Sequence, residues 1–332
     1  MREQPRGQQR QQRKVLVTGG AGFIGSYVVR LLLAEECDVY VYDSFVVYAA
    51  PDPNKEQPNF AFRLKGIYDQ IHLIRGSTLN KDFLRRQLLE IQPDVIMHMA
   101  AMPLAALAIE HTEEAFQSIV TSTHNILEVM RDFTHPCRLV YVSSSMVYGD
   151  FQTPEVDEDH PKNPKDIYGA FKLAGEIIAS AYAKNYDLET VICRPTAVYG
   201  PFDANSRVIQ KLITNALQGR PLTLDGDGSM KLDFTFVEDT ARGITLCATH
   251  PNARGKVFNI SYGQSRTMSE LAEIIQRYLP NTQVQHRDAP RYMPSRGTLS
   301  IARANREIGF ASRVPLEEGV PRYIEHLRQH SF

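Results

Sequence analysis

A tyrosine and a lysine stand one helical turn apart in the run Tyr168-Gly169-Ala170-Phe171-Lys172. At this spacing two helical residues share one face, so the Lys172 ammonium is expected beside the Tyr168 phenol. A neighbouring cation stabilises phenolate and lowers the pKa of the phenol, which makes tyrosine a usable base near neutral pH. Such pairs are commonplace and mostly structural, so a chemical role needs further support.

That support comes from Ser143-Ser144-Ser145, which closes a predicted strand at residues 139–143. The carboxyl ends of parallel strands are where open α/β sheets bind ligands. A serine hydroxyl there can hydrogen-bond the same substrate oxygen that the tyrosine deprotonates. The three residue types together predict a site that moves a proton to and from a substrate hydroxyl.

A glycine-rich turn follows the first predicted strand, in V-L-V-T-G-G-A-G-F-I-G at residues 15–25. Gly19 permits a tight turn, Gly22 lets the backbone approach a pyrophosphate, and Gly25 lets the helix pack closely on the strand. The next strand, 39–42, ends in Asp43, whose carboxylate would accept both ribose hydroxyls. A structural glycine turn followed by a solvated aspartate is the alternative.

Asp43 also bears on the choice of cofactor. Its carboxylate would repel a ribose 2′-phosphate, and no arginine follows it at residues 44–46 to pair with one. The sequence therefore favours NAD over NADP.

At these motifs the sequence resembles the extended short-chain dehydrogenase/reductase family, in its nucleotide-sugar epimerase and dehydratase branch. The resemblance runs from residue 14 to the C-terminus. Its segments are T-G-G-A-G-F-I-G from Thr18, H-M-A-A from His98, S-S-S-M-V-Y-G from Ser143, Y-G-A-F-K from Tyr168, R-P-T-A-V-Y-G-P from Arg194, L-D-F-T-F-V-E-D from Leu232 and F-N-I-S from Phe258. It implies a tightly held NAD that takes a hydride from a sugar carbon, leaves a keto intermediate and later returns the hydride.

The resemblance also assigns site residues. It implies that the catalytic groups are Ser144, Tyr168 and Lys172. The implied cofactor contacts are Gly19, Gly22, Phe23, Ile24, Gly25, Asp43, Ser44, Ser77, Thr78, Met99, Ala100, Ala101, Tyr168 and Lys172. The implied substrate contacts are Ser144, Ser145, Met146, Thr196, Arg207 and Arg296, with the two arginines as cations for a diphosphate. No metal site is expected, and His98 is interpreted as structural.

The chain departs from the family pattern at several positions. Ser77 replaces a usual adenine-contacting aspartate, Ile119 replaces a common asparagine, and Thr196 and Leu232 stand where relatives bind the nucleotide or the diphosphate. Part of the substrate contact must therefore be rearranged.

Two further substitutions bear on the reaction. Relatives that remove water from the sugar carry an Asp-Glu pair after the catalytic serine, and decarboxylating relatives keep the glutamate; here the residues are Ser145 and Met146. Epimerisation, most often at C4, needs no additional proton carrier and is favoured, with a UDP-hexose or UDP-hexuronate as the expected substrate. The alternatives, in order, are a nucleotide-sugar dehydrogenase or reductase, a 4,6-dehydratase, and a non-catalytic NAD sensor, which would usually have lost the tyrosine or the lysine.

The elements that position these residues alternate between strands and helices. Helices are predicted at 81–91, 113–132 and 167–184, and strands at 71–75, 94–99, 138–143 and 189–194, with an irregular loop at 51–66. This alternation predicts an α/β Rossmann-type doubly wound parallel sheet at 14–195. A smaller C-terminal α/β substrate lobe is predicted at 196–332, with helices at 207–217 and 268–279. Strand-like segments at 232–238 and 256–261 could return to the main sheet.

Composition sets the remaining limits. The 332 residues are 43% hydrophobic with a net charge of −1, which does not favour a nucleic-acid or membrane surface. The Gln- and Arg-rich leader at 1–13 is predicted to be disordered. The 4 cysteines are interpreted as reduced core thiols, and without a signal-peptide core or an 18-residue apolar run the expected location is the cytoplasm. By the family resemblance, helices 113–132 and 167–184 would form a homodimer interface.

Overall fold

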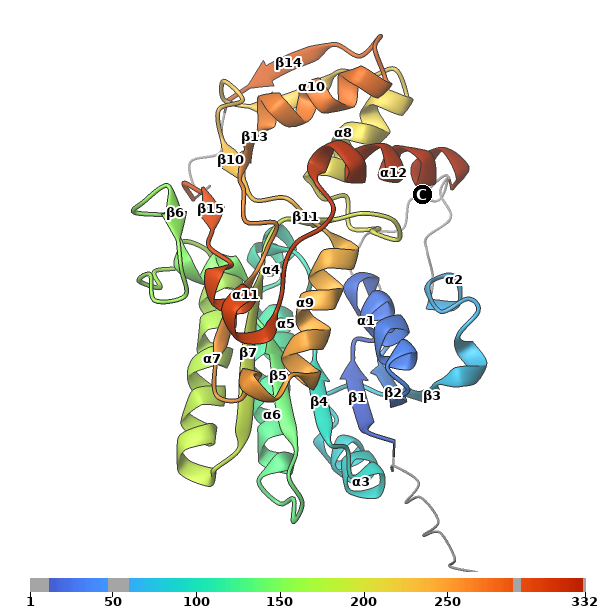
Figure 1. The fold of residues 1–332 in the computed structure, drawn as a ribbon, viewed down its shortest axis with the longest axis vertical. Helices are drawn as coiled ribbons and strands as arrows, with labels where there is room; N and C mark the ends of the chain where they lie inside the picture. The colour runs from blue at the N-terminus through green and yellow to red at the C-terminus, as the bar shows by residue number, and fades with distance from the viewer. Residues whose placement is uncertain (1–11, 47–59, 289–293, 331–332) are drawn as a thin grey trace, which may run out of the picture.

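The computed structural model describes residues 12–46, 60–288 and 294–330, and a seven-stranded parallel sheet forms its centre (Figure 1). The strand order is β12-β7-β5-β4-β1-β2-β3. Their bounds are β1 Lys14–Thr18, β2 Asp38–Asp43, β3 His72–Arg75, β4 Val95–His98, β5 Arg138–Val142, β7 Glu189–Pro195 and β12 Val257–Ile260. This order, with its reversal between β1 and β4, confirms the predicted doubly wound Rossmann-type sheet.

Helices cover both faces of the sheet, which is why its inner strands β1, β4 and β5 are almost entirely buried and mainly apolar. On one face α1 (Phe23–Ala34) and α9 (Val237–Thr249) pack together over β1, β5 and β7. On the other face lie α3 (Lys81–Ile91), α6 (Ser122–Met130) and α7 (Ile167–Tyr186), whose apolar side chains form a second core with β1, β4 and β5.

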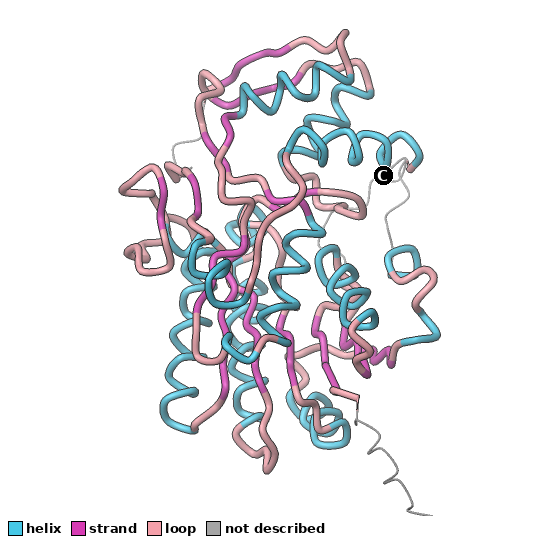
Figure 2. Tube along the Cα trace, viewed as in Figure 1, coloured by secondary structure: helices cyan, strands magenta, loops and turns pink. Residues whose placement is uncertain are grey.

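A smaller lobe lies beyond the carboxyl ends of the strands (Figures 1 and 2). It consists of α8 (Val208–Leu217), α10 (Met268–Tyr278), α12 (Leu316–Gln329) and the parallel pair β9 (Leu222–Asp225) and β14 (Val284–Arg287). These elements share their own apolar core, which includes Leu212, Leu271 and Tyr323.

The other elements are short, and along the chain they lie between those of the sheet and those of the smaller lobe. Their bounds are α2 Phe60–Arg63, η1 Tyr68–Gln70, α4 Ala105–Glu110, α5 Thr112–Phe116, η2 Gln117–Thr121, η3 Ser145–Tyr148, β6 Glu155–Val156, β8 Val198–Tyr199, β10 Lys231–Leu232, β11 Thr235–Phe236, η4 Pro251–Ala253, β13 Arg266–Thr267, β15 Thr298–Leu299 and α11 Ala302–Ile308. β6, in the segment after η3, pairs with β15, and β8, which follows β7, pairs with β11, so both segments are tied to the C-terminal third of the chain.

Several elements differ from the sequence prediction. The helix expected at 113–132 is α5 and α6 joined by the π-helical turn η2, and the described end of the 51–66 loop contains α2. Of the two segments that could return to the main sheet, 256–261 does so as β12 beside β7. The segment 232–238 instead forms β10 and β11, paired outside the main sheet, and α9 begins at Val237.

The first described residues bear on the predicted leader, most of which, 1–11, lies outside the described residues. The Arg13 carbonyl accepts a hydrogen bond from the Asp38 amide at 2.9 Å, and the Arg13 guanidinium donates to the Thr249 carbonyl at 3.4 Å. Arg13 is therefore held against β2 and α9. No helix in the described ranges has the length and apolar character required to cross a membrane.

Candidate active site

The turn between β1 and α1 brings three backbone segments unusually close together. Gly19 has φ +71°, and a Cβ on it would lie 2.9 Å from the Ala100 backbone. A Cβ on Gly25 would lie 2.2 Å from the Gly19 carbonyl oxygen. Only glycine is compatible with these approaches, so the turn leaves the N-terminus of α1 open toward the cavity beside it.

Asp43, at the end of β2, is held facing the same turn. Its Oδ2 accepts a hydrogen bond from the Ala21 amide at 3.0 Å, and its Oδ1 accepts one from the Phe45 amide at 2.8 Å. Burial raises the pKa of this carboxyl above its ordinary value, although these amides and the Arg63 charge oppose the rise. The carboxylate is fixed in orientation with lone pairs left for a ligand.

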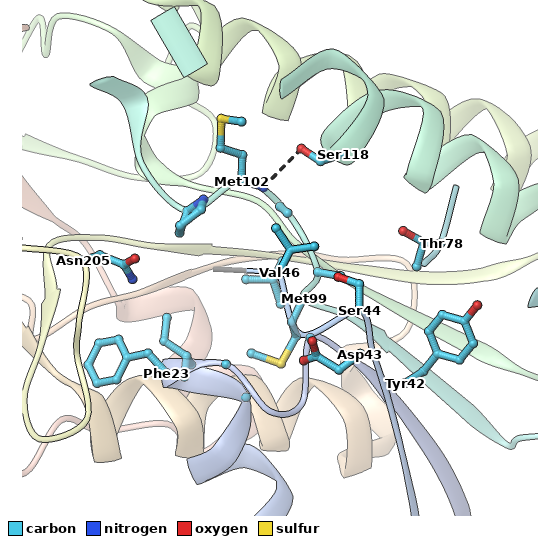
Figure 3. A pocket seen from close by; sticks show the side chains of 18 of the residues that line it. Phe23, Tyr42, Asp43, Ser44, Val46, Thr78, Met99, Met102, Ser118 and Asn205 are labelled. Carbon is cyan, nitrogen blue, oxygen red and sulfur yellow. Dashed lines mark hydrogen bonds between the residues drawn. The ribbon is translucent and has the colours of Figure 1, made fainter. Parts of the chain in front are cut away.

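These groups open into a cavity of about 360 Å³ at the point where the strand order reverses (Figure 3). All the residues assigned to NAD from the sequence line it: Gly19, Gly22, Phe23, Ile24, Gly25, Asp43, Ser44, Ser77, Thr78, Met99, Ala100, Ala101, Tyr168 and Lys172. Their contacts with the cofactor stay predictions, which this shared position supports.

A buried chain of hydroxyls and an imidazole positions the cavity wall after β4. The Thr18 hydroxyl accepts from the amides of Met99 and Ala100, both at 3.2 Å, and lies 2.9 Å from His98 Nδ1. His98 Nε2 lies 3.3 Å from the Ser122 hydroxyl, which donates to Thr78 at 2.7 Å. Burial lowers the His98 pKa to about 3, so the ring is neutral and structural, as interpreted from the sequence.

The proposed catalytic side chains meet at the end of the cavity next to β5. Lys172 Nζ donates to the Val142 carbonyl at 2.8 Å and lies 5.8 Å from the centre of the Tyr168 ring. Ser144, whose hydroxyl also caps η3 by accepting from the Met146 amide at 3.2 Å, hydrogen-bonds the Tyr168 hydroxyl. Serine, tyrosine and lysine are thus brought together as the sequence predicted.

The electrostatics differ from the expectation of a Tyr168 pKa lowered by lysine. Burial raises the Tyr168 pKa to about 12, and the opposing influences are the Arg207 charge and the Ser144 hydrogen bond. Burial also lowers the Lys172 pKa to about 8, opposed by Glu176. With the polypeptide's own groups alone, the Tyr168 phenol is therefore protonated at neutral pH, and Lys172 changes between its charged and neutral forms near pH 8.

A buried ion pair between Glu176 and Arg194 lies next to Lys172. Glu176, one turn after Lys172 on α7, accepts two hydrogen bonds from Arg194, at 2.9 and 2.6 Å, and one from Ser143 at 2.5 Å. Arg194 also donates to the Tyr148 hydroxyl at 2.8 Å. The pair ties α7, which carries Tyr168 and Lys172, to β7 and to the segment from Ser143 to Tyr148, which includes Ser144.

The residues assigned to the substrate fall into two groups. Arg296 donates to Met146 Sδ at 2.8 Å, to the Ser145 hydroxyl and to the Thr196 hydroxyl at 3.5 Å, which gathers four of the predicted contacts beside Ser144. Arg207 instead lines the main cavity, with its guanidinium 5.6 Å from the Phe23 ring centre and paired with Asp203. Arg207 is therefore close to the glycine turn as well as to Tyr168.

The sequence that forms this cavity matches a known protein family. Residues 15–261 match the model described as the NAD dependent epimerase/dehydratase family. The chain belongs to this family. NAD is accordingly its cofactor, and the glycine cradle at Gly19 and Gly25 with the Asp43 carboxylate fits the pyrophosphate and the ribose of NAD.

Family members with known sequences or structures resemble the chain over most of its length. An uncharacterized UDP-glucose epimerase of Bacillus subtilis (strain 168) is 28% identical over 95% of this chain and 98% of that protein. A dTDP-glucose 4,6-dehydratase of Neisseria meningitidis is 30% identical over 79% of this chain and 75% of that protein. The crystal structure of a UDP-glucuronic acid 4-epimerase from Bacillus cereus, in complex with UDP-glucuronic acid and NAD, is 27% identical with a TM-score of 0.86, and the alignment covers 95% of this chain and 99% of that one.

Against this family pattern, the structure adds residues that the sequence analysis missed. At the family's asparagine position Ile119 is buried in the core, and the preceding Ser118 faces the cavity instead, where its hydroxyl accepts from the Met102 amide at 3.2 Å (Figure 3). Both residues lie in the π-helical turn η2, a distortion that often occurs at functional sites.

Two other missed residues come from distant segments. Arg63 of α2 lines the cavity, with its guanidinium held by the Phe202 carbonyl at 3.1 Å, and Asn205 lines it from the loop after β8. Neither stands in a motif, so only the folded chain could reveal them. In the described part of the chain, no group of three or more His, Cys, Asp or Glu side chains could hold a metal ion.

Proposed function

We propose that the protein is a nucleotide-sugar 4-epimerase acting on a UDP-hexose or UDP-hexuronate. The observation that carries the proposal is the Ser144, Tyr168 and Lys172 cluster at the NAD cavity, followed by Ser145 and Met146 where a dehydratase needs carboxylates. With a proton carrier only at the tyrosine, the site can oxidise and reduce one carbon but has no second acid to expel water.

The chain's own residues manage one proton. The Tyr168 hydroxyl, bonded to Ser144, is the only titratable group of the cluster placed to receive a proton from a sugar hydroxyl, and Ser144 would orient that hydroxyl. Lys172, anchored on the Val142 carbonyl, would favour phenolate by its charge. Bound NAD supplies the hydride acceptor and donor.

Relatives that are named as epimerases and relatives that are named as dehydratases both support the wider reaction class. The Bacillus cereus structure is named a UDP-glucuronic acid 4-epimerase, and the Neisseria meningitidis relative a dTDP-glucose 4,6-dehydratase. Identity does not separate them, at 27% and 30%. The assignment to epimerisation therefore depends on Ser145 and Met146.

The decisive experiment incubates the purified protein with a panel of UDP- and dTDP-sugars and follows the sugar by NMR. We expect a C4 epimer to form with no net consumption of added NAD and with flat absorbance at the wavelength of reduced nicotinamide. Absorbance that rises in step with turnover would instead identify a dehydrogenase. A 4-keto-6-deoxy product would identify a dehydratase, and NAD binding without any product would identify a sensor.

A further inference from the structure

Arg296 is a cation fixed beside the catalytic serine. Its guanidinium donates to the side chains of Ser145 and Met146, the two residues after Ser144, and lies 5.3 Å from the centre of the Phe151 ring. Burial lowers the Arg296 pKa to about 10, so the group is still charged at neutral pH. A partly desolvated charge of this kind is costly unless an anion meets it.

The position of Arg296 is built by the backbone on both sides of it. The Ser295 carbonyl accepts from the Phe151 amide at 2.9 Å, and the Thr298 amide donates to the Pro154 carbonyl at 2.9 Å. A Cβ on Gly297 would lie 2.3 Å from that same carbonyl oxygen. Side-chain contacts and backbone together pre-organise the guanidinium beside Ser145 and Met146.

No carboxylate among the described residues forms an ion pair with Arg296. The acids that influence it are committed elsewhere: Asp166 caps α7 by accepting from the Gly169 amide at 2.7 Å. Asp233 accepts from the amides of Gly263 at 3.2 Å and Leu299 at 3.1 Å. The ligands that the protein itself gives to Arg296 are neutral, which leaves its charge for a bound anion.

We propose that Arg296, with Ser145 and Thr196, binds the C6 carboxylate of a nucleotide hexuronate, so that the substrate is an acidic rather than a neutral sugar. The guanidinium is planar and presents paired donors, which matches a carboxylate. The hydroxyls of Ser145 and Thr196 each retain lone pairs and a proton that can complete the contact. This proposal depends on the proposed function, because it takes C4 as the reacting carbon.

Sugar geometry distinguishes this role from the diphosphate contact predicted from the sequence. With the C4 oxygen on Ser144 and Tyr168, the C6 carboxylate is attached at C5, the ring carbon next to C4. The diphosphate is attached at C1, on the opposite side of the ring. A cation that touches the residues directly after Ser144 therefore faces C6 more readily than the diphosphate.

The test compares UDP-glucuronate with UDP-glucose in the NAD-loaded protein. We expect the wild type to have a kcat/KM at least 100-fold higher for UDP-glucuronate. Arg296→Gln should lower kcat/KM for UDP-glucuronate about 100-fold and change that for UDP-glucose less than about threefold, because only the acid loses a charge-assisted contact. Arg296→Lys should retain part of the preference, since it keeps the charge but loses the fork of donors.

Arg306→Gln is the matched control, because it removes one positive charge from a side chain that is 67% exposed on α11. It should leave kcat/KM unchanged for both UDP-glucuronate and UDP-glucose. NAD content and the unfolding midpoint of each variant show whether it is folded. Equal losses for both sugars in folded Arg296→Gln would overturn the proposal and favour a diphosphate contact. A wild type that prefers UDP-glucose would also overturn it.

Binding separates this proposal from the proposed reaction. In the Tyr168→Phe holoenzyme, which lacks the proposed proton acceptor, calorimetry should still find UDP-glucuronate bound at least tenfold more tightly than UDP-glucose. Arg296→Gln in that background should abolish the difference. If no epimer forms but the Arg296-dependent preference persists, the substrate class stands while the reaction must be revised. If epimerisation occurs with no such preference, the carboxylate site is wrong.

Discussion

At the scale of single residues, burial shifts the pKa values of Tyr168 and Lys172 away from the values that their proposed roles require. Burial raises the Tyr168 pKa to about 12 and lowers the Lys172 pKa to about 8. A base that works near neutral pH requires phenolate to be stabilised by the groups around it. We therefore expect the influences of Ser144 and Arg207 on Tyr168, and of Glu176 on Lys172, to matter for activity as well as for structure.

Tyr168→Phe should abolish turnover and leave NAD bound. The substitution removes one hydroxyl and its hydrogen bond with Ser144 while keeping the ring, so packing is retained. Product analysis by NMR should show at least a 1,000-fold lower rate, consistent with loss of general acid–base catalysis, alongside unchanged NAD content. Normal activity in this variant would remove Tyr168 from the mechanism.

The pH dependence of activity should report Lys172. Its pKa is lowered to about 8, so the ammonium is present below pH 8 and is lost as the pH rises through that value. We expect kcat/KM to fall above about pH 8. Glu176 raises the Lys172 pKa, so Glu176→Gln should move this fall to lower pH.

Glu176→Gln should also destabilise the fold by roughly 3–5 kcal/mol, because Arg194 keeps its charge but loses its buried partner. Glu238→Gln is the control, since Glu238 and Arg322 form an exposed pair worth about 1 kcal/mol or less. Urea unfolding and a kcat/KM profile from pH 6 to 10 measure both effects. An unshifted profile in folded Glu176→Gln would show that this carboxylate has a structural role only.

At the scale of elements, the β1–α1 turn and the π-helical turn η2 shape the cavity by opposite means. The first works through missing side chains, because glycine lets α1 approach β1. The second works through an extra residue in one helical turn, which puts Ser118 on the cavity side and Ile119 in the core. Both change which backbone or side-chain atoms face the cofactor.

Gly25→Ala should destabilise the protein far more than Gly22→Ala. A Cβ at Gly25 would lie 2.2 Å from the Gly19 carbonyl and 2.8 Å from the Gly20 backbone, neither of which can move independently. At Gly22 the nearest atom is 3.0 Å away and φ is −74°. We expect a loss of about 3 kcal/mol for Gly25→Ala and less than about 1 for Gly22→Ala, measured by urea unfolding without added NAD. Equal losses would contradict the packing argument.

At the scale of the whole molecule, one outer face carries exposed apolar side chains that the fold leaves uncovered. They lie on α4, α5 and α7, of which α5 and α7 are in contact through the Phe116 and Phe171 rings at 5.5 Å. Ile177 is 61% exposed, and Ile109, Phe116 and Tyr186 are exposed as well. Exposed apolar side chains gathered on packed helices are typical of an interface. The homodimer stays a prediction, and these side chains are where we expect its interface.

Ile177→Glu should convert a dimer into a monomer. A charge at the centre of the α7 face would have to be buried against the partner, at a cost of several kcal/mol. Sedimentation velocity at micromolar concentration should show a dimer for the wild type and a monomer for the variant. Tyr278→Glu, on α10 of the smaller lobe and 45% exposed in the wild type, should stay dimeric. A monomeric wild type would refute the interface.

The sequence alone determined what depends on short spacings. Three features depend only on residues close in the sequence: the glycine turn, Asp43 at the end of β2 and the Tyr168–Lys172 pair. Local geometry is therefore enough to predict them. Strand and helix alternation likewise determined the doubly wound sheet, because parallel strands covered by helices on both faces are mainly apolar.

Only the tertiary structure decided the contacts that join distant segments. Arg296 meets Ser145 across 151 positions, and Arg63 reaches the Phe202 carbonyl across 139. The π-helical turn that exchanges Ile119 for Ser118 breaks the helical period on which sequence reading depends, and α9 begins where a strand was predicted. No local pattern encodes these features, because their stability comes from packing between segments rather than within one.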